Sequence, residues 1–203
     1  MGSVATWADV RVCIVDDSRH FQNLFRTLLR GMGFRRVDVF GDAVEARTFV
    51  SETPVDVAFV DVMMPRLNGI DWVRSVRRTT LLANPTMPIA LVSGHVDRRV
   101  LEAAIAAGVD DVLVKPLAPS TLHRHVARLL RHPLPYVRGT DGYFGPDMQS
   151  VLPRLRRDAA FATPLRAAQP GDLGERAARR SLPGLHVELR RRTDYDAEQT
   201  FLD

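Results

Sequence analysis

Short apolar runs alternate with stretches of helical periodicity along residues 10–131 of the chain. The runs are rich in Val and Ile and cover residues 10–15, 37–40, 55–60, 89–92 and 112–114. Because they are apolar without strict alternation, they are typical of short strands buried on both faces of a sheet. In the clearest helical stretch, from Phe21 to Met32, apolar residues recur every three or four positions, with Ser18 as the expected N-cap. Four more helices are expected at 42–52, around 72–76, at 97–107 and from 119 onwards.

The alternation of five strands with five helices predicts an α/β fold. Each strand that leads through a helix into the next strand forms a right-handed crossover, and such units build a doubly wound parallel sheet covered by helices on both faces. Ligands bind sheets of this kind beyond the carboxyl ends of the strands. The residues that directly follow each predicted strand are therefore the candidates for chemistry.

Polar residues follow four of the five predicted strands. Asp16 and Asp17 follow the first strand, Asp61 the third, Ser93 the fourth and Lys115 the fifth. Three carboxylates that converge at one edge raise each other's pKa unless a cation neutralises them, and Mg²⁺ prefers such oxygen ligands. A carboxylate in such a site can attack phosphorus and form an acyl phosphate. We therefore expect magnesium-dependent phosphoryl transfer, in which Ser93 and Lys115 bind the oxygens of the transferred group.

Composition and charge narrow the class of protein. The 203 residues are 45% apolar and 26% charged, which supports a globular core and excludes a wholly disordered or fibrous chain. Cys13 is the single cysteine, so an internal disulfide framework is excluded. We find no apolar run of membrane-spanning length and no secretory signal, and we expect a cytoplasmic protein without membrane contact. The net charge of +4 is spread along the chain, which argues against nucleic acid as a partner.

Lysine usage singles out one position. Of the 28 basic residues, all except Lys115 are arginine. An ammonium is a compact charge on a flexible stem, whereas a guanidinium is a planar fork. A compact cation suits a crowded site that must hold a phosphoryl oxygen, so this usage supports the role expected for Lys115.

Four motifs, taken in order, resemble the receiver domain of two-component response regulators. They are VCIVDDS at 12–18, DVMMPRLNG at 61–69, VSG at 92–94 and VKP at 114–116. The resemblance covers residues 8–131 and implies a flavodoxin-like sheet with strand order 2-1-3-4-5. It also implies a phosphoacceptor signalling protein rather than an enzyme, one that assists its own phosphorylation and dephosphorylation.

The resemblance assigns a role to each strand-end residue. Asp61 would accept a phosphoryl group from a sensor histidine kinase or a histidine phosphotransfer protein. Asp16, Asp17, the carboxylate of Asp61 and the backbone carbonyl of Met63 would hold Mg²⁺. Ser93 and Lys115 would bind the phosphoryl oxygens, and the peptide bond from Lys115 to the following proline would be cis. The downstream protein is not defined by these motifs, and self-association as a homodimer stays open.

One position departs from the family pattern. Receiver domains usually carry Tyr or Phe three residues before the lysine, where this chain has Val112. An alternative hypothesis is therefore a receiver-fold interaction module that acts independently of phosphorylation. His95 and Met63 would flank the mouth of the site, where we expect them to affect the lifetime of the phosphoryl group more than its formation.

Residues 132–203 form an extension that is richer in Pro and Gly than the preceding part and contains several Arg clusters. It lacks the helix periodicity of a DNA-binding output domain. The segment from Tyr143 to Asp147 indicates a turn with two aromatic residues. We expect a largely irregular extension that is flexible, orders on a partner or folds back on the first domain. Binding of nucleic acid through its arginines is the third hypothesis.

Overall fold

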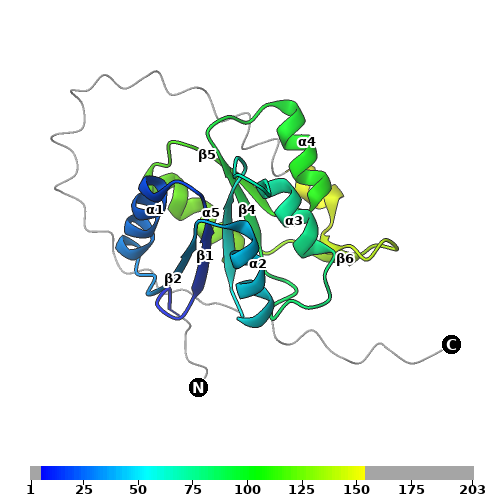
Figure 1. Ribbon diagram of the computed structural model, residues 1–203, viewed down its shortest axis with the longest axis horizontal. Coiled ribbons are helices and arrows are strands. Elements are labelled where there is room, and N and C mark those ends of the chain that lie inside the picture. Colours follow the sequence, from blue (N-terminus) through cyan, green and yellow to red (C-terminus); the bar gives the residue numbers. More distant parts are fainter. Residues whose placement is uncertain (1–5, 154–203) are drawn as a thin grey trace.

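The sheet consists of five parallel strands in the order β2-β1-β3-β4-β5, as expected. The computed structural model describes residues 6–153 (Figure 1). The strands are β1 (Arg11–Val15), β2 (Arg36–Phe40), β3 (Val57–Asp61), β4 (Ile89–Ser93) and β5 (Asp111–Val114). All four neighbouring pairs are parallel. The carboxyl ends of β1, β3, β4 and β5 therefore meet at one edge of the sheet.

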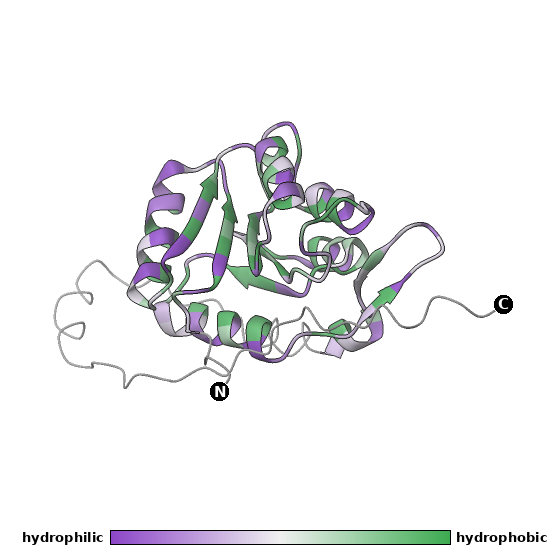
Figure 2. Ribbon diagram, turned by 90° about the horizontal axis from the view of Figure 1, so that it is seen from below, coloured by the Kyte–Doolittle hydropathy of each residue, from purple (hydrophilic) through white to green (hydrophobic). Residues whose placement is uncertain are grey.

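Helices cover both faces of this sheet (Figures 1 and 2). They are α1 (Arg19–Gly31), α2 (Ala43–Glu52), α3 (Gly69–Arg77), α4 (Arg98–Ala107) and α5 (Pro119–Arg131). Buried residues of α1 and α5 share one apolar cluster with one side of the strands. Buried residues of α2, α3 and α4 form a second cluster on the other side. β1, β3 and β4 are buried between these clusters, which explains why their sequences are apolar without alternation, whereas the edge strand β2 is partly exposed.

Polar side chains cap four of these five helices; α5 begins after Ala118 without such a cap. The Ser18 hydroxyl accepts a hydrogen bond from the Phe21 amide at the start of α1, and the Asp42 carboxylate caps α2. Asp97 caps α4 in the same way. Such caps satisfy amide donors that have no partner within the helix. Within residues 6–153, no helix is long and apolar enough to cross a membrane.

The first part of the predicted extension has regular structure. The chain continues from α5 into an antiparallel hairpin of β6 (Tyr136–Arg138) and β7 (Phe144–Pro146), followed by a helical turn at 148–153. Val151 is buried in the cluster under α3 and α4, and Leu134 packs against it. These apolar contacts join the hairpin to the sheet and its helices. The remainder of the extension, including its clusters at Arg154–Arg157 and Arg190–Arg192, lies outside the described residues.

A buried polar cluster, which we call the arginine node, fixes the hairpin to the sheet. The Arg77 guanidinium, fully buried at the end of α3, pairs with Asp110 at 2.7 Å. It also donates hydrogen bonds to the backbone carbonyls of Gly108 and Met87, each at 2.9 Å. The Tyr136 hydroxyl, which comes from the hairpin, lies 3.0 Å from the Met87 carbonyl oxygen and 3.1 Å from the Asp110 carboxylate. A buried ion pair needs such additional hydrogen bonds to offset its desolvation.

Candidate phosphoryl-transfer site

Three of the predicted residues meet at the carboxyl edge of the sheet. The Lys115 ammonium donates to Asp16 Oδ2 at 2.7 Å and to Asp61 Oδ1 at 2.5 Å. Asp16 follows β1, Asp61 ends β3 and Lys115 follows β5, so one cation connects three strands. The two carboxylates are almost completely buried, and the lysine is partly exposed. We call this cluster of two buried carboxylates around one ammonium the acidic pocket.

The local backbone holds both carboxylates in place. The second oxygen of Asp61 accepts a hydrogen bond from the Met63 amide at 2.7 Å. The second oxygen of Asp16 accepts one from the Ser18 amide at 2.8 Å. Gly69 lies so close that a Cβ atom there would approach the Asp61 carbonyl oxygen to 2.1 Å. The loop after β3 can therefore return to the Asp61 backbone only because position 69 has no side chain.

Ser93 lies on the strand beside that of Asp61, but its hydroxyl does not join the hydrogen bonds of the Lys115 ammonium. The Ser93 hydroxyl, at the end of β4, donates to the His95 carbonyl at 2.6 Å. Ser93 pairs in register with Val114, and its carbonyl accepts from the Lys115 amide at 2.7 Å. The Lys115–Pro116 bond is cis, as expected. The hydroxyl thus lies on β4, the strand between that of Asp61 and the one that Lys115 follows.

Asp17 and Met63 are exposed. Within residues 6–153, Asp17 forms no hydrogen bond or ion pair, and the Met63 side chain is 78% exposed. In the same part of the chain, no group of three or more Asp, Glu, His or Cys side chains is arranged as metal ligands. The structure thus brings together the carboxylates of Asp16 and Asp61. That Asp17 joins them stays a prediction.

Burial and Lys115 shift the pKa of Asp61 in opposite directions. Burial raises the pKa of Asp61 above its usual value, and the charge of Asp16 adds to this, although the hydrogen bond and charge of Lys115 oppose it. For Lys115, burial favours the neutral amine, but hydrogen bonds to Asp16 and Asp61 outweigh it and raise the pKa above its usual value. The lysine is therefore a persistent cation in this site.

The chemistry of the donors fits a hard divalent cation. Asp16 and Asp61 offer carboxylate oxygens from neighbouring strands, and the exposed Met63 and Asp17 lie one or two residues away along the chain. Mg²⁺ binds through one or two carboxylates and keeps several waters. Two buried carboxylates that share a single ammonium carry an excess negative charge, which a cation would neutralise.

Sequence reasoning missed one buried ion pair near the opposite edge. His125 Nδ1 lies 2.7 Å from the carboxylate of Asp111, which also pairs with Arg128. Leu122, Val126 and Leu129 share the helical face of His125, and this apolar face could have predicted its burial.

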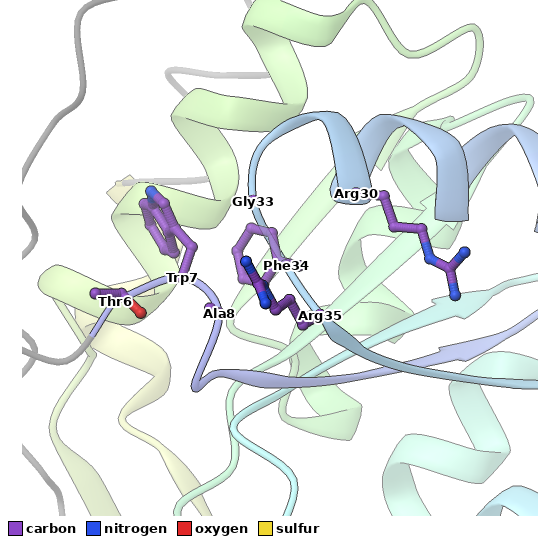
Figure 3. A pocket seen from close by; sticks show the side chains of 7 residues that line it. All are labelled: Thr6, Trp7, Ala8, Arg30, Gly33, Phe34 and Arg35. Carbon is purple, nitrogen blue, oxygen red and sulfur yellow. The ribbon is translucent and has the colours of Figure 1, made fainter.

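A hollow lies at the opposite edge of the sheet. It has a volume of about 550 Å³ and is lined by Thr6, Trp7, Ala8, Arg30, Gly33, Phe34 and Arg35 (Figure 3). These residues precede β1 and β2, so they lie at the amino ends of the strands. Figure 3 shows that Arg30 and Arg35 do not converge on one point. This hollow is separate from the acidic pocket.

Comparisons with known proteins agree with this architecture. The response regulator receiver domain family matches residues 12–127. The DNA-binding response regulator MtrA of Mycolicibacterium paratuberculosis is 33% identical over 121 residues, which cover 60% of this chain and 51% of MtrA. The cyclic di-GMP phosphodiesterase response regulator RpfG of Xanthomonas campestris pv. campestris is 32% identical over 133 residues, covering 64% of this chain and 35% of RpfG. The chain thus spans about half, or less, of the length of these relatives.

A solved structure shows the same arrangement of strands and helices. The chemotaxis protein CheY4 of Vibrio cholerae superposes with a TM-score of 0.55 and 28% identity, over 60% of this chain and 98% of CheY4. The shared part is the five-stranded sheet with its helices. Together with the acidic pocket and the family match over more than half of the sequence, this shows that the chain belongs to the response regulator receiver domain family.

Proposed function

We propose that this protein is a phosphoacceptor of two-component signalling, in which Asp61 accepts a phosphoryl group from a sensor histidine kinase or a histidine phosphotransfer protein. The proposal depends on one observation, the Lys115 ammonium that connects Asp61 with Asp16 at the carboxyl edge of the sheet. A cation fixed beside the carboxylate would neutralise charge on an incoming phosphoryl group, which lowers the repulsion between two anions as the carboxylate oxygen approaches phosphorus. The signal would then be passed on through protein contacts.

In the proposed reaction, a carboxylate oxygen of Asp61 attacks phosphorus. The new P–O bond forms as the P–N bond of the donor's phosphohistidine breaks, and the imidazole leaves with the electron pair and takes up a proton. The Lys115 ammonium would then bind an oxygen of the transferred group. The Ser93 hydroxyl would turn from the His95 carbonyl toward a second oxygen of the phosphoryl group. This change requires only a rotation of the Ser93 side chain.

Asp16, Asp17, Asp61 and the Met63 carbonyl are the residues proposed to hold Mg²⁺. When bound, this cation supplies charge neutralisation and orientation for the attacking carboxylate and the incoming phosphoryl oxygens. Asp16 is fixed for this role by the Ser18 amide, and its backbone carbonyl accepts a hydrogen bond from the Gln22 side chain at 2.6 Å. The pocket is thus preorganised before a donor arrives.

The direct test is labelling of the purified chain with acetyl phosphate. We expect a Mg²⁺-dependent mass increase that maps to the peptide containing Asp61 and is absent from Asp61→Asn. Asp9→Asn, a change of an exposed aspartate far from the pocket, is the matched control and should be labelled like the wild type. Labelling that persists in Asp61→Asn or that is independent of Mg²⁺ would contradict the proposal.

The same experiment separates the alternative role. A folded wild type that takes up no phosphoryl group from acetyl phosphate would favour the interaction module that acts independently of phosphorylation. MtrA is described as DNA-binding. For this chain, nucleic-acid binding through the arginines of the extension would instead require an affinity that falls steeply with salt and is lost on truncation after Arg131.

A further inference from the structure

An aromatic ring completes the surroundings of the Lys115 ammonium. The nitrogen lies 3.7 Å from the centroid of the Phe21 ring, well within the distance at which a cation interacts with a ring face. Phe21 belongs to the first turn of α1, directly after the loop that carries Asp16. The ammonium therefore has two carboxylate partners and one aromatic face.

The ring itself is held by the core. Phe21 stacks on Phe25 with centroids 5.5 Å apart, and Phe25 meets Phe59 of β3 edge to face at 5.0 Å. Phe25 and Phe59 are fully buried, whereas Phe21 is half-buried at the end of this aromatic row. Since rings packed in this way have little freedom, Phe21 presents a fixed surface to the lysine.

The Lys115 side chain has to span the distance from β5 to β3, and a fixed surface beside its ammonium helps to hold it there. Lys115 follows β5, while Asp61 ends β3 and Asp16 follows β1, so β4 lies between the lysine and its nearer partner. Neighbouring strands are about 4.8 Å apart, which puts the backbones of β5 and β3 about 10 Å apart. A lysine side chain has several rotatable bonds, and holding it across this distance costs conformational entropy.

The chemistry of the ring suits a cation that must change partners. Two of the three ammonium protons are directed to carboxylates. A carboxylate at position 21 would bind the third proton strongly, whereas a ring face attracts the charge without a directed hydrogen bond. The third proton therefore stays available for an arriving phosphoryl oxygen.

We infer that Phe21 is a positioning residue of the phosphoryl-transfer site: its ring face holds the Lys115 ammonium over Asp61 while leaving one N–H able to bind the transferred group. This inference rests on the proposed function of Asp61. It adds a residue that none of the four motifs includes.

The test compares Phe21→Leu, Phe21→Tyr and Phe21→Trp with the wild type. Leu keeps an apolar side chain but removes the ring face, whereas Tyr and Trp retain a face. Phe49→Leu is the matched control, because Phe49 is also half-buried and paired with another ring, that of Phe40, but does not contact the lysine. Circular dichroism and thermal unfolding select the variants that fold.

The first readout is the resonance of the lysine side chain. Because Lys115 is the single lysine of the sequence, ¹³C-lysine labelling gives one side-chain spin system. We expect a ring-current shift in the wild type, Phe49→Leu, Phe21→Tyr and Phe21→Trp, and its loss in Phe21→Leu. A lysine signal that is unchanged in folded Phe21→Leu would overturn the contact.

The second readout is the rate of acetyl phosphate labelling at Asp61. A cation–ring interaction of about 0.5–2 kcal/mol corresponds to labelling roughly 2- to 30-fold slower in Phe21→Leu, with near wild-type rates in Phe21→Tyr and Phe21→Trp. Equal rates in Phe21→Leu and wild type would overturn the inference, as would equally slow rates in all three Phe21 variants. A wild type that is not labelled would instead refute the proposed function, and the positioning role with it.

Discussion

Replacement of the buried Arg77 by methionine should destabilise the protein severely. Arg77 and the next residue, Arg78, are both paired with an aspartate in the structure. The Arg77 side chain and that of Asp110 are 0% and 2% exposed, whereas those of Arg78 and Asp141 are 39% and 56% exposed. The two substitutions Arg77→Met and Arg78→Met therefore make the same chemical change at adjacent positions, once inside the protein and once at its surface.

The expected magnitudes differ because of desolvation. Arg77→Met leaves the Asp110 carboxylate buried without its guanidinium, and removal of one partner of a buried pair costs about 3–5 kcal/mol. The carbonyls of Gly108 and Met87 lose a donor as well. For the exposed pair of Arg78, the loss should be about 0–1 kcal/mol. A difference of about 3 kcal/mol corresponds to roughly 6–12 °C in Tm for a domain of this size.

Urea unfolding followed by tryptophan fluorescence measures both changes, since Trp72 is fully buried on α3. Tyr136→Phe provides a milder variant that removes only one hydroxyl from the arginine node and should cost about 1.5–3 kcal/mol, as its partner is charged. If Arg77→Met lowered the free energy of unfolding by no more than Arg78→Met, the reasoning about the node would be wrong. If Tyr136→Phe were as stable as the wild type, the hydrogen bond of the Tyr136 hydroxyl would not be what joins the hairpin to the core.

Three further changes test other parts of the structure. Met63→Ala, at an exposed position two residues after Asp61, should alter the half-life of phosphorylated protein in a dephosphorylation assay more than its labelling rate, and an unaltered half-life would contradict this. Gly69→Ala should abolish labelling or folding because of its backbone clash, whereas Gly31→Ala, with open space around it, should be tolerated; circular dichroism and acetyl phosphate labelling distinguish the two. Burial favours the protonated form of the Asp111 carboxyl, but His125 and Arg128 outweigh burial and lower the pKa of Asp111. The contribution of this carboxylate to stability is therefore complete above the pKa of about 4 that it has in the unfolded chain, and it is lost as the pH falls further. The stability gap between wild type and Asp111→Asn should therefore narrow below about pH 4 in urea titrations, and a gap that is constant with pH would refute the assignment.

The sequence predicted the fold because its signals are local. The five apolar runs and the expected N-cap Ser18 indicated the elements within a few residues of their observed ends. The runs at 55–60 and 112–114 were each displaced by one or two residues, since β3 begins at Val57 and β5 at Asp111. Carboxyl ends of parallel strands must share an edge, so the candidate residues after those strands could be chosen without coordinates.

Contacts between distant residues could not be predicted in this way. A charged residue is expected at the surface, yet Arg77 is buried because Asp110, two carbonyls and the hairpin satisfy it. The apolar face of α3 that contains Val73, Val76 and position 77 is a signal that could have suggested this burial. For residues 132–153, folding back on the first domain was one of three open alternatives, and no local pattern chose among them.

The sequence alone determined the order of strands and helices and which side chains lie at the functional edge, because periodicity and chain direction are properties of short segments. Tertiary structure decided which of those side chains meet. It brought Lys115 to Asp16 and Asp61 and set Phe21 against it, while Asp17 faces outward. The physical reason is that such contacts depend on the separation and twist of strands and on packing between helices far apart in the chain, and no local pattern records those distances.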